Sequence, residues 1–176
     1  MRHNVALTLG LCAFAAAAVA QEPNAPTPGP EHKKLAYYAG NWKTDADLKA
    51  MGPFAGGKVT GTGHGEMIGG FFMVTRASSK SPMGSVDELE IMGYDAKEGV
   101  YTYDGFNSSG EHETYKGTVE GDTWTWTGSS NLGGQTVKGR FVAKATSASS
   151  YTFRFDYSPD GSSWVNVMEG KATKTD

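Results

Sequence analysis

His64-Gly65-Glu66 is the segment of the chain best suited to chemistry, and His112 is a third residue of the same kind further along the sequence. In an extended strand, residues two apart share a face, so the imidazole of His64 and the carboxylate of Glu66 can meet. Such a pair can exchange a proton with a substrate. With His112 added, the three residues would form the catalytic group of an isomerase, lyase or hydrolase.

The same residues also fit a plainer interpretation, as solvated or hydrogen-bonded strand residues. A zinc site needs three or four ligands, and the chain after residue 20 offers only three histidines and no cysteine. We therefore expect no metal site. The short motifs of serine hydrolases, phosphate-binding loops and zinc peptidases are absent as well. These gaps favour a protein that binds a ligand without transforming it, and leave the enzyme as an alternative.

The elements that must position these residues are strands. From Trp42 onward, runs rich in Thr, Val and aromatic residues alternate with turn-forming clusters such as Glu120-Gly121-Asp122 and Ser158-Pro159-Asp160-Gly161. We expect strands near residues 41–50, 57–67, 70–79, 86–94, 100–106, 111–119, 123–129, 135–146, 151–157 and 164–173. Connections this short make sequence neighbours antiparallel neighbours in space. The chain should therefore fold as an all-β, up-and-down meander barrel of 8–10 strands.

A short helix should precede the barrel. Pro30 can serve as a first helical residue, and Leu35, Tyr38 and Ala39 then fall on one face before Gly40 ends the turn. We expect this helix to plug one end. Within the strands, Trp124 and Trp126 share one face, as do the aromatic residues of the segment 151–157. These aromatic faces are predicted to line the barrel interior.

The N-terminal segment has the composition of an export signal. A basic start is followed by an apolar run and by Ala18-Val19-Ala20, which suits signal peptidase cleavage. We expect residues 1–20 to be a signal peptide, 21–30 a proline-rich tether and 31–176 the barrel domain, in a periplasmic or secreted protein. The apolar run is too short to span a bilayer, so no transmembrane segment is expected. Scattered Lys and Arg argue against nucleic acid as a partner.

Several short pieces occur in an order that resembles the bacterial family called domain of unknown function 1579, of the lipocalin-like calycin group. They are His32-Lys33-Lys34-Leu35, Gly40-Asn41-Trp42, Met51-Gly52-Pro53, Gly69-Gly70-Phe71-Phe72, Met83-Gly84, Met92-Gly93-Tyr94-Asp95, Asp104-Gly105-Phe106-Asn107-Ser108-Ser109-Gly110 and Met168-Glu169-Gly170. The resemblance implies a lipocalin-like or fatty-acid-binding-protein-like barrel in a bacterial, often exported, protein. It implies no particular reaction.

A barrel of this type encloses a ligand, and two polar groups could hold one. The guanidinium of Arg154, with Tyr103 or Tyr157, could bind a carboxylate, although strand arginines also pair with acids on the next strand. His64 or His112 could serve as the axial ligand of a haem, as one histidine does in some ten-stranded lipocalin-like barrels, although the leading hypothesis needs no cofactor.

The leading hypothesis is an exported barrel that binds a small apolar or amphipathic molecule. The residues expected to contact the ligand are Trp42, Phe72, Tyr103, Trp124, Phe153, Arg154 and Met168. The alternatives are an enzyme built on His64, Glu66 and His112, a haem-binding barrel, or a structural domain with a packed interior. The sequence does not indicate an oligomeric state.

Overall fold

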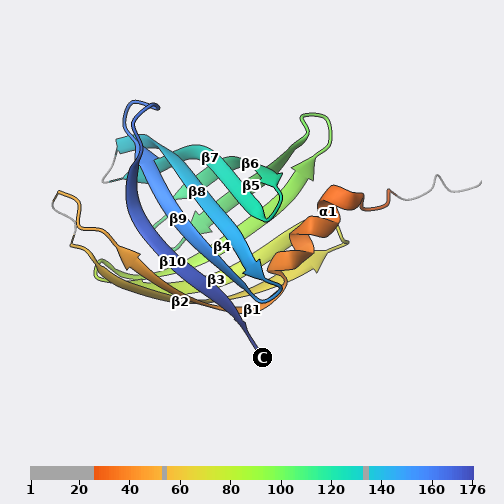
Figure 1. Cartoon of the computed structure of the whole chain (residues 1–176), viewed down its shortest axis with the longest axis horizontal. Coiled ribbons are helices and arrows are strands. Elements are labelled where there is room, and N and C mark those ends of the chain that lie inside the picture. The colour runs from red at the N-terminus through yellow and green to blue at the C-terminus, as the bar shows by residue number, and fades with distance from the viewer. Residues whose placement is uncertain (1–25, 53–54, 133–134) are drawn as a thin grey trace, which may run out of the picture.

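The computed structural model describes residues 26–52, 55–132 and 135–176, and these form a closed antiparallel barrel (Figure 1). The expected signal peptide and residues 21–25 of the tether lie outside the described residues. The strands are β1 (Gly40–Leu48), β2 (Gly57–Ile68), β3 (Phe72–Ser81), β4 (Gly84–Asp95), β5 (Val100–Asn107), β6 (His112–Glu120), β7 (Thr123–Leu132), β8 (Gln135–Ser147), β9 (Ser150–Ser158) and β10 (Val165–Thr175).

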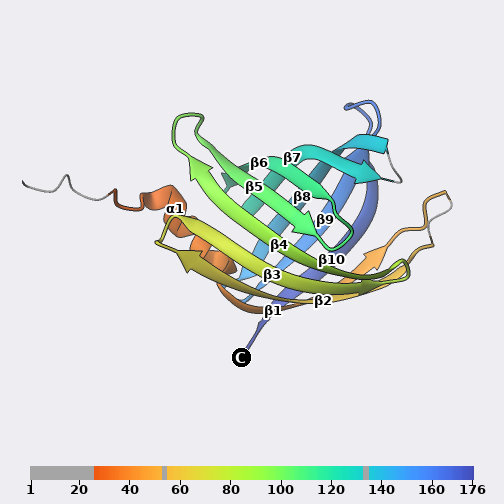
Figure 2. The ribbon, with the colours of Figure 1, turned by 180° about the vertical axis from the view of Figure 1, so that it is seen from behind.

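Each strand is paired with its neighbours in sequence, and the last strand is paired with the first. Strand β1 is antiparallel to β10 from Asn41, opposite Thr175, to Leu48, opposite Met168. No strand among the described residues is therefore left with an unpaired edge. The view from behind shows the same meander running from β2 to β10 without a crossover (Figure 2). The prediction of an up-and-down barrel is confirmed.

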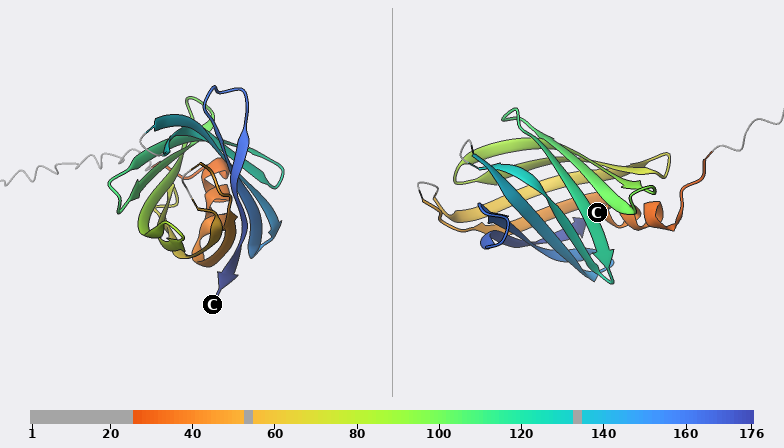
Figure 3. Two further views of the ribbon diagram at one scale, coloured as in Figure 1. Left: turned by 90° about the vertical axis from the view of Figure 1, so that its left-hand side faces the viewer. Right: turned by 90° about the horizontal axis from the view of Figure 1, so that it is seen from above.

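The short N-terminal helix is also confirmed, and it lies at one end of the barrel (Figure 3). It consists of α1 (Pro30–Lys34) and a 3-10 turn, η1 (Leu35–Tyr38), and it begins with proline as expected. Leu35 is fully buried, and Tyr38 packs against Trp124 and Tyr151 from the barrel wall. We call α1 and η1 together the plug. The plug buries apolar side chains that the barrel end would otherwise expose.

The plug fits because a glycine faces it. A Cβ atom added to Gly65 would lie 2.5 Å from the backbone oxygen of Tyr38 and 3.1 Å from the sulfur of Met73. We expect Gly65→Ala to lower the free energy of unfolding by about 1 kcal/mol, since the plug must shift to admit the methyl group. Gly63→Ala is the matched control, because its nearest contact would be an ordinary 3.5 Å. Urea unfolding of both variants checks this, and equal stabilities would contradict it.

Burial alternates along the strands and assigns the two faces of the sheet. In β1, Trp42 and Ala46 are buried, whereas Asn41, Lys43 and Asp45 are exposed. Residues that are paired across neighbouring strands share a face, so the register identifies the inner face of each strand. Trp42 of β1 is paired with Gly63 of β2, and Met73 of β3 is paired with Met92 of β4. Inner and outer faces can thus be assigned for each described strand.

Candidate ligand site inside the barrel

The interior divides into two halves that differ in burial. Near the plug, the inward side chains are buried, among them Met73, Met92, Tyr101 and Trp124. Toward the opposite end, which we call the open half, many inward side chains are only half-buried. They include Leu48, Val59, Ser79, Val86, Glu88, Glu90, Tyr103, Asn107, Phe141, Phe155 and Met168. Because a closed sheet surrounds them, water can reach these side chains only from inside the barrel. The described residues therefore do not completely fill the interior of the open half.

Strands β4 and β6, on either side of β5, bring carboxylates into this interior. Glu88 and Glu90 lie on the inner face of β4, and Glu113 lies on the inner face of β6. We call these three residues the acidic wall. The hydroxyl of Tyr103, on the intervening strand, donates to Oε1 of Glu90 at 3.2 Å. The hydroxyl of Tyr115 donates to Oε2 of Glu113 at 3.3 Å.

A glycine gives Tyr103 its position beside Glu90. Gly105 is paired with Glu90 across the strands, and a Cβ atom there would lie 2.8 Å from the Tyr103 ring. The ring therefore leans over Gly105, toward the carboxylates. Burial first, and then the negative charge of Glu90, raise the pKa of the Tyr103 hydroxyl far above its usual value. The hydroxyl consequently stays protonated and acts as a hydrogen-bond donor.

Of the two carboxylates on β4, that of Glu90 is the more perturbed. Burial, and secondarily the charge of Glu88, raise the pKa of Glu90 to about 7, although the Tyr103 hydrogen bond acts in the opposite direction. Burial, followed by the charge of Glu113, raises the pKa of Glu88. After burial, the next cause of the raised pKa of Tyr151, on β9, is the charge of Glu90. The Glu90 carboxylate can therefore gain or lose a proton near neutral pH.

The strands across the barrel from the acidic wall present an apolar surface. Phe141 of β8 stacks on Phe153 of β9 at a centroid distance of 5.4 Å. Phe155 of β9 is paired with Phe141 on one side and with Met168 of β10 on the other. The open half thus has an acidic side and an apolar side, which suits an amphipathic molecule.

The structure places the predicted ligand contacts in three locations. Tyr103 and Met168 face the open half and are half-buried. Trp42, Trp124 and Phe153 also face inward but are buried, the two tryptophans against the tyrosines of the plug.

Phe72 and Arg154 lie outside the barrel, so they are not available to an enclosed ligand. Phe72 is 49% exposed on the outer face. Nε of Arg154 lies 3.4 Å from Asp156, which also pairs with Arg140. The expectation of a carboxylate held by an interior Arg154 is therefore corrected. Its side chain alternates with the aromatic residues of β9 and pairs with Asp156 two residues along the same strand, rather than with an acid of the next strand.

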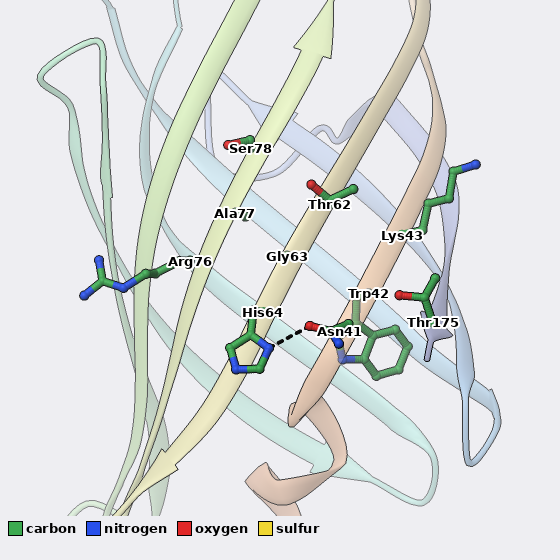
Figure 4. Close-up of a pocket in the computed structure, with 10 residues that line it drawn as sticks. All are labelled: Asn41, Trp42, Lys43, Thr62, Gly63, His64, Arg76, Ala77, Ser78 and Thr175. Atoms are coloured by element: carbon green, nitrogen blue, oxygen red, sulfur yellow. Dashed lines mark hydrogen bonds between the residues drawn. The ribbon is translucent and has the colours of Figure 1, made fainter.

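The proposed catalytic residues also lie on the outer face. His64 and Glu66 are exposed residues of β2, and Nδ1 of His64 lies 2.7 Å from Oδ1 of Asn41 (Figure 4). His64 lines an open groove of about 370 Å³ across β1, β2 and β3, and Arg76 of β3 is another of its lining residues. His112 stacks on Phe106, and its Nε2 lies 3.1 Å from Asp104.

These placements separate the members of the expected group. Three strands lie between His64 on β2 and His112 on β6, which is roughly 19 Å along the sheet at about 4.8 Å per strand. They do not converge in the interior, and neither imidazole can be an axial haem ligand there. Among the described residues, no group of three or more His, Asp or Glu side chains is arranged to hold a metal ion. Nor is any described helix long and apolar enough to cross a membrane.

Sequence reasoning missed the acidic wall, although the sequence contains a signal for it. In β4, Glu88 and Glu90 have the same parity as Met92 and Tyr94, and Met92 is buried. A strand whose apolar residues continue as glutamates on the same face predicts carboxylates inside the barrel.

Comparison with known proteins places this geometry in a wider context. A family model described as "Protein of unknown function (DUF1579)" matches residues 27–174. The structure is similar to that of Rv2717c from M. tuberculosis, with a TM-score of 0.60 and 10% sequence identity over 85% of this chain and 99% of that chain. It is also similar to EF1p2_mFAP2b bound to DFHBI, with a TM-score of 0.47 and 12% identity over 82% and 98% of the two chains. No curated protein matches the chain. At these identities, the first likeness bears on the fold alone.

Proposed function

Because the chain belongs to the DUF1579 family, whose function is unknown, we propose from its own geometry that it binds a small amphipathic molecule inside the open half of the barrel. The observation that carries the proposal is the half-buried state of inward side chains such as Phe155, Met168 and Tyr103. Apolar surface that stays in contact with water inside a barrel costs free energy, which a ligand with an apolar body relieves.

The contacts follow from the two sides of the interior. Phe141, Phe155 and Met168 would cover the apolar body of the ligand, and Tyr103 would contact its polar end beside the acidic wall. The buried residues Trp42, Trp124 and Phe153 would support this surface from the side of the plug. We further propose that the protein acts after export to the periplasm or the medium. The leader-like composition of residues 1–20 supports export.

Filling the interior is the direct test. Ser79 is an inward, half-buried residue of the open half, and the adjacent Lys80 is exposed on the outer face. We expect Ser79→Phe to weaken binding of the neutral probe 2-naphthylmethanol at least ten-fold, because the new ring occupies the same space. Lys80→Phe, the control for the added ring, should bind as the wild type does. Isothermal titration calorimetry measures both.

The same pair of variants distinguishes a binding cavity from a packed interior. If the interior is a cavity, Ser79→Phe should change the free energy of unfolding by less than about 1 kcal/mol. Overpacking of a filled core would cost about 1–3 kcal/mol instead. A wild-type protein that shows no saturable binding, together with a strongly destabilised Ser79→Phe variant, would contradict the proposed function. His64→Ala and Arg154→Ala should leave binding unchanged, since both side chains face outward.

A further inference from the structure

The charged side chains that the described residues place in the open half of the interior are all acidic. Every Lys and Arg of strands β1 to β9 that the structure describes points outward. Lys174 of β10 faces inward, but it lies at the plug end, over the rings of Trp42 and Tyr37. The connections at the open end carry one cation, Lys49, whose ammonium is 2.8 Å from Glu169. Residues 130–135, whose side chains are not described, include no Lys, Arg or His. Among the described residues, Glu88 and Glu90 therefore have no cationic partner.

Acceptor atoms of the wall also remain unused. Among the described residues, the side chain of Glu88 forms no hydrogen bond or ion pair, and the side chain of Glu90 accepts one hydrogen bond, at Oε1. Every side-chain oxygen or nitrogen of the described residues that is shielded from water has a hydrogen-bond partner. Because Oε2 of Glu90 has no such partner, it must border space that water can reach. Glu90 is half-buried on the inner face, and burial is the main cause of its raised pKa. An unpartnered carboxylate oxygen on the inner face of a barrel, bordering space that water can reach, is a position for a ligand donor.

We propose that the ligand of the barrel is a protonated amine with an aromatic or apolar body, and that Glu88 and Glu90 bind its ammonium group. This inference rests on the proposed function and specifies its ligand class. The N–H groups of an ammonium would donate to Oε2 of Glu90 and to Glu88, in charge-assisted hydrogen bonds. The ring of Tyr103 borders the same position and would favour a cation further. A carboxylate ligand would meet three like charges and no cation.

A matched series of probes tests the charge preference. 2-Naphthylmethylamine, 2-naphthylmethanol and 2-naphthoate share one ring system and differ in charge. We expect the amine to bind the wild-type protein at pH 8 at least ten-fold more tightly than the alcohol, and the carboxylate to bind more weakly than the alcohol. Glu88→Gln and Glu90→Gln should each remove most of the advantage of the amine while leaving the affinity for the alcohol within about two-fold. Glu66→Gln, which changes an exposed outer carboxylate, should keep the full advantage.

The outcomes separate this inference from the proposed function. If the alcohol binds as tightly as the amine, or if Glu66→Gln lowers amine binding as much as Glu90→Gln does, the ammonium site is wrong and the binding function stands. If none of the three probes binds, both proposals fail. Because glutamine keeps the size and one oxygen of glutamate, loss of the amine advantage at an unchanged alcohol affinity reports charge rather than misfolding.

Discussion

Trp124→Ala is expected to lower the free energy of unfolding by about 3–5 kcal/mol, the usual cost of removing a large buried aromatic side chain. Trp124 is 5% exposed and lies where barrel wall and plug meet. Its ring is 4.8 Å from that of Tyr101, 5.3 Å from that of Tyr38 and 5.9 Å from that of Trp126. Tyr101 in turn donates a hydrogen bond to Glu31 of the plug at 2.7 Å. Losing the indole would therefore weaken the attachment of the plug as well as the core.

Chemical denaturation followed by near-ultraviolet circular dichroism measures this loss. Since a loss of this size could unfold the domain, Trp124→Phe provides a second measurement, with an expected loss of about 1–2 kcal/mol. Trp164→Ala is the matched control, because that tryptophan is only half-buried and packs under the guanidinium of Arg140 on the outer face. Trp124 was expected from the sequence to be a ligand contact. A Trp124→Ala variant as stable as Trp164→Ala would show that it is not part of the core.

The strands could be predicted because their turns are local and chemically explicit. Asp95 accepts hydrogen bonds from the backbone of Lys97 and Glu98, and Gly99 has the positive φ that ends this turn. One boundary was wrong for an equally local reason. The third strand was expected to begin at residue 70, but Gly69 and Gly70 both have positive φ and form the turn, so β3 begins at Phe72. Sequence shows that such a glycine can bend the chain without showing where the bend lies.

The site was harder to predict than the fold because it depends on which face of its strand each residue occupies. A shift of one residue along a strand moves every side chain to the opposite face. His64 was predicted to be a site residue because of its chemistry. The inward Trp42 is paired with Gly63, however, so the adjacent His64 faces outward. The outward position of Arg154 could have been predicted from the sequence. Its neighbours Phe153 and Phe155 occupy the opposite face of the strand, and their aromatic rings favour the interior. The glutamates of β4 were overlooked because carboxylates are expected at the surface. Their inward position follows from that of Met92, which lies on the same face of β4. That no described cation lies near Glu88 and Glu90 could be established only from the structure of the closed barrel.

Substitution of Glu90 should change both the stability of the protein and its affinity for an amine, so the two effects can be compared in one variant. The groups that act on the pKa of its carboxylate are Glu88 of β4 and Tyr103 of β5, and its charge in turn raises the pKa of Tyr151 of β9 and of Tyr38 of the plug. None of them is a cation, so the folded protein favours the protonated form of Glu90. Between its ordinary pKa of 4.5 and its raised pKa of about 7, the folded state binds more protons than the unfolded state. The contribution of Glu90 to the free energy of unfolding must therefore fall as the pH rises through that window.

Glu90→Gln should remove this penalty and stabilise the ligand-free protein by about 2–3 kcal/mol at pH 8, since each unit of pKa shift corresponds to about 1.4 kcal/mol and water reaches part of the side chain. At pH 4.5, where Glu90 is mostly protonated in the wild type, the gain should nearly vanish. Urea unfolding from pH 4.5 to 8 measures both values, with Glu66→Gln as the outer-face control. A Glu90→Gln variant that is less stable than the wild type at pH 8 would mean that an internal partner compensates the charge. A variant that gains stability while losing amine binding would show that the wild-type protein retains a destabilising carboxylate in its interior because the ligand requires it.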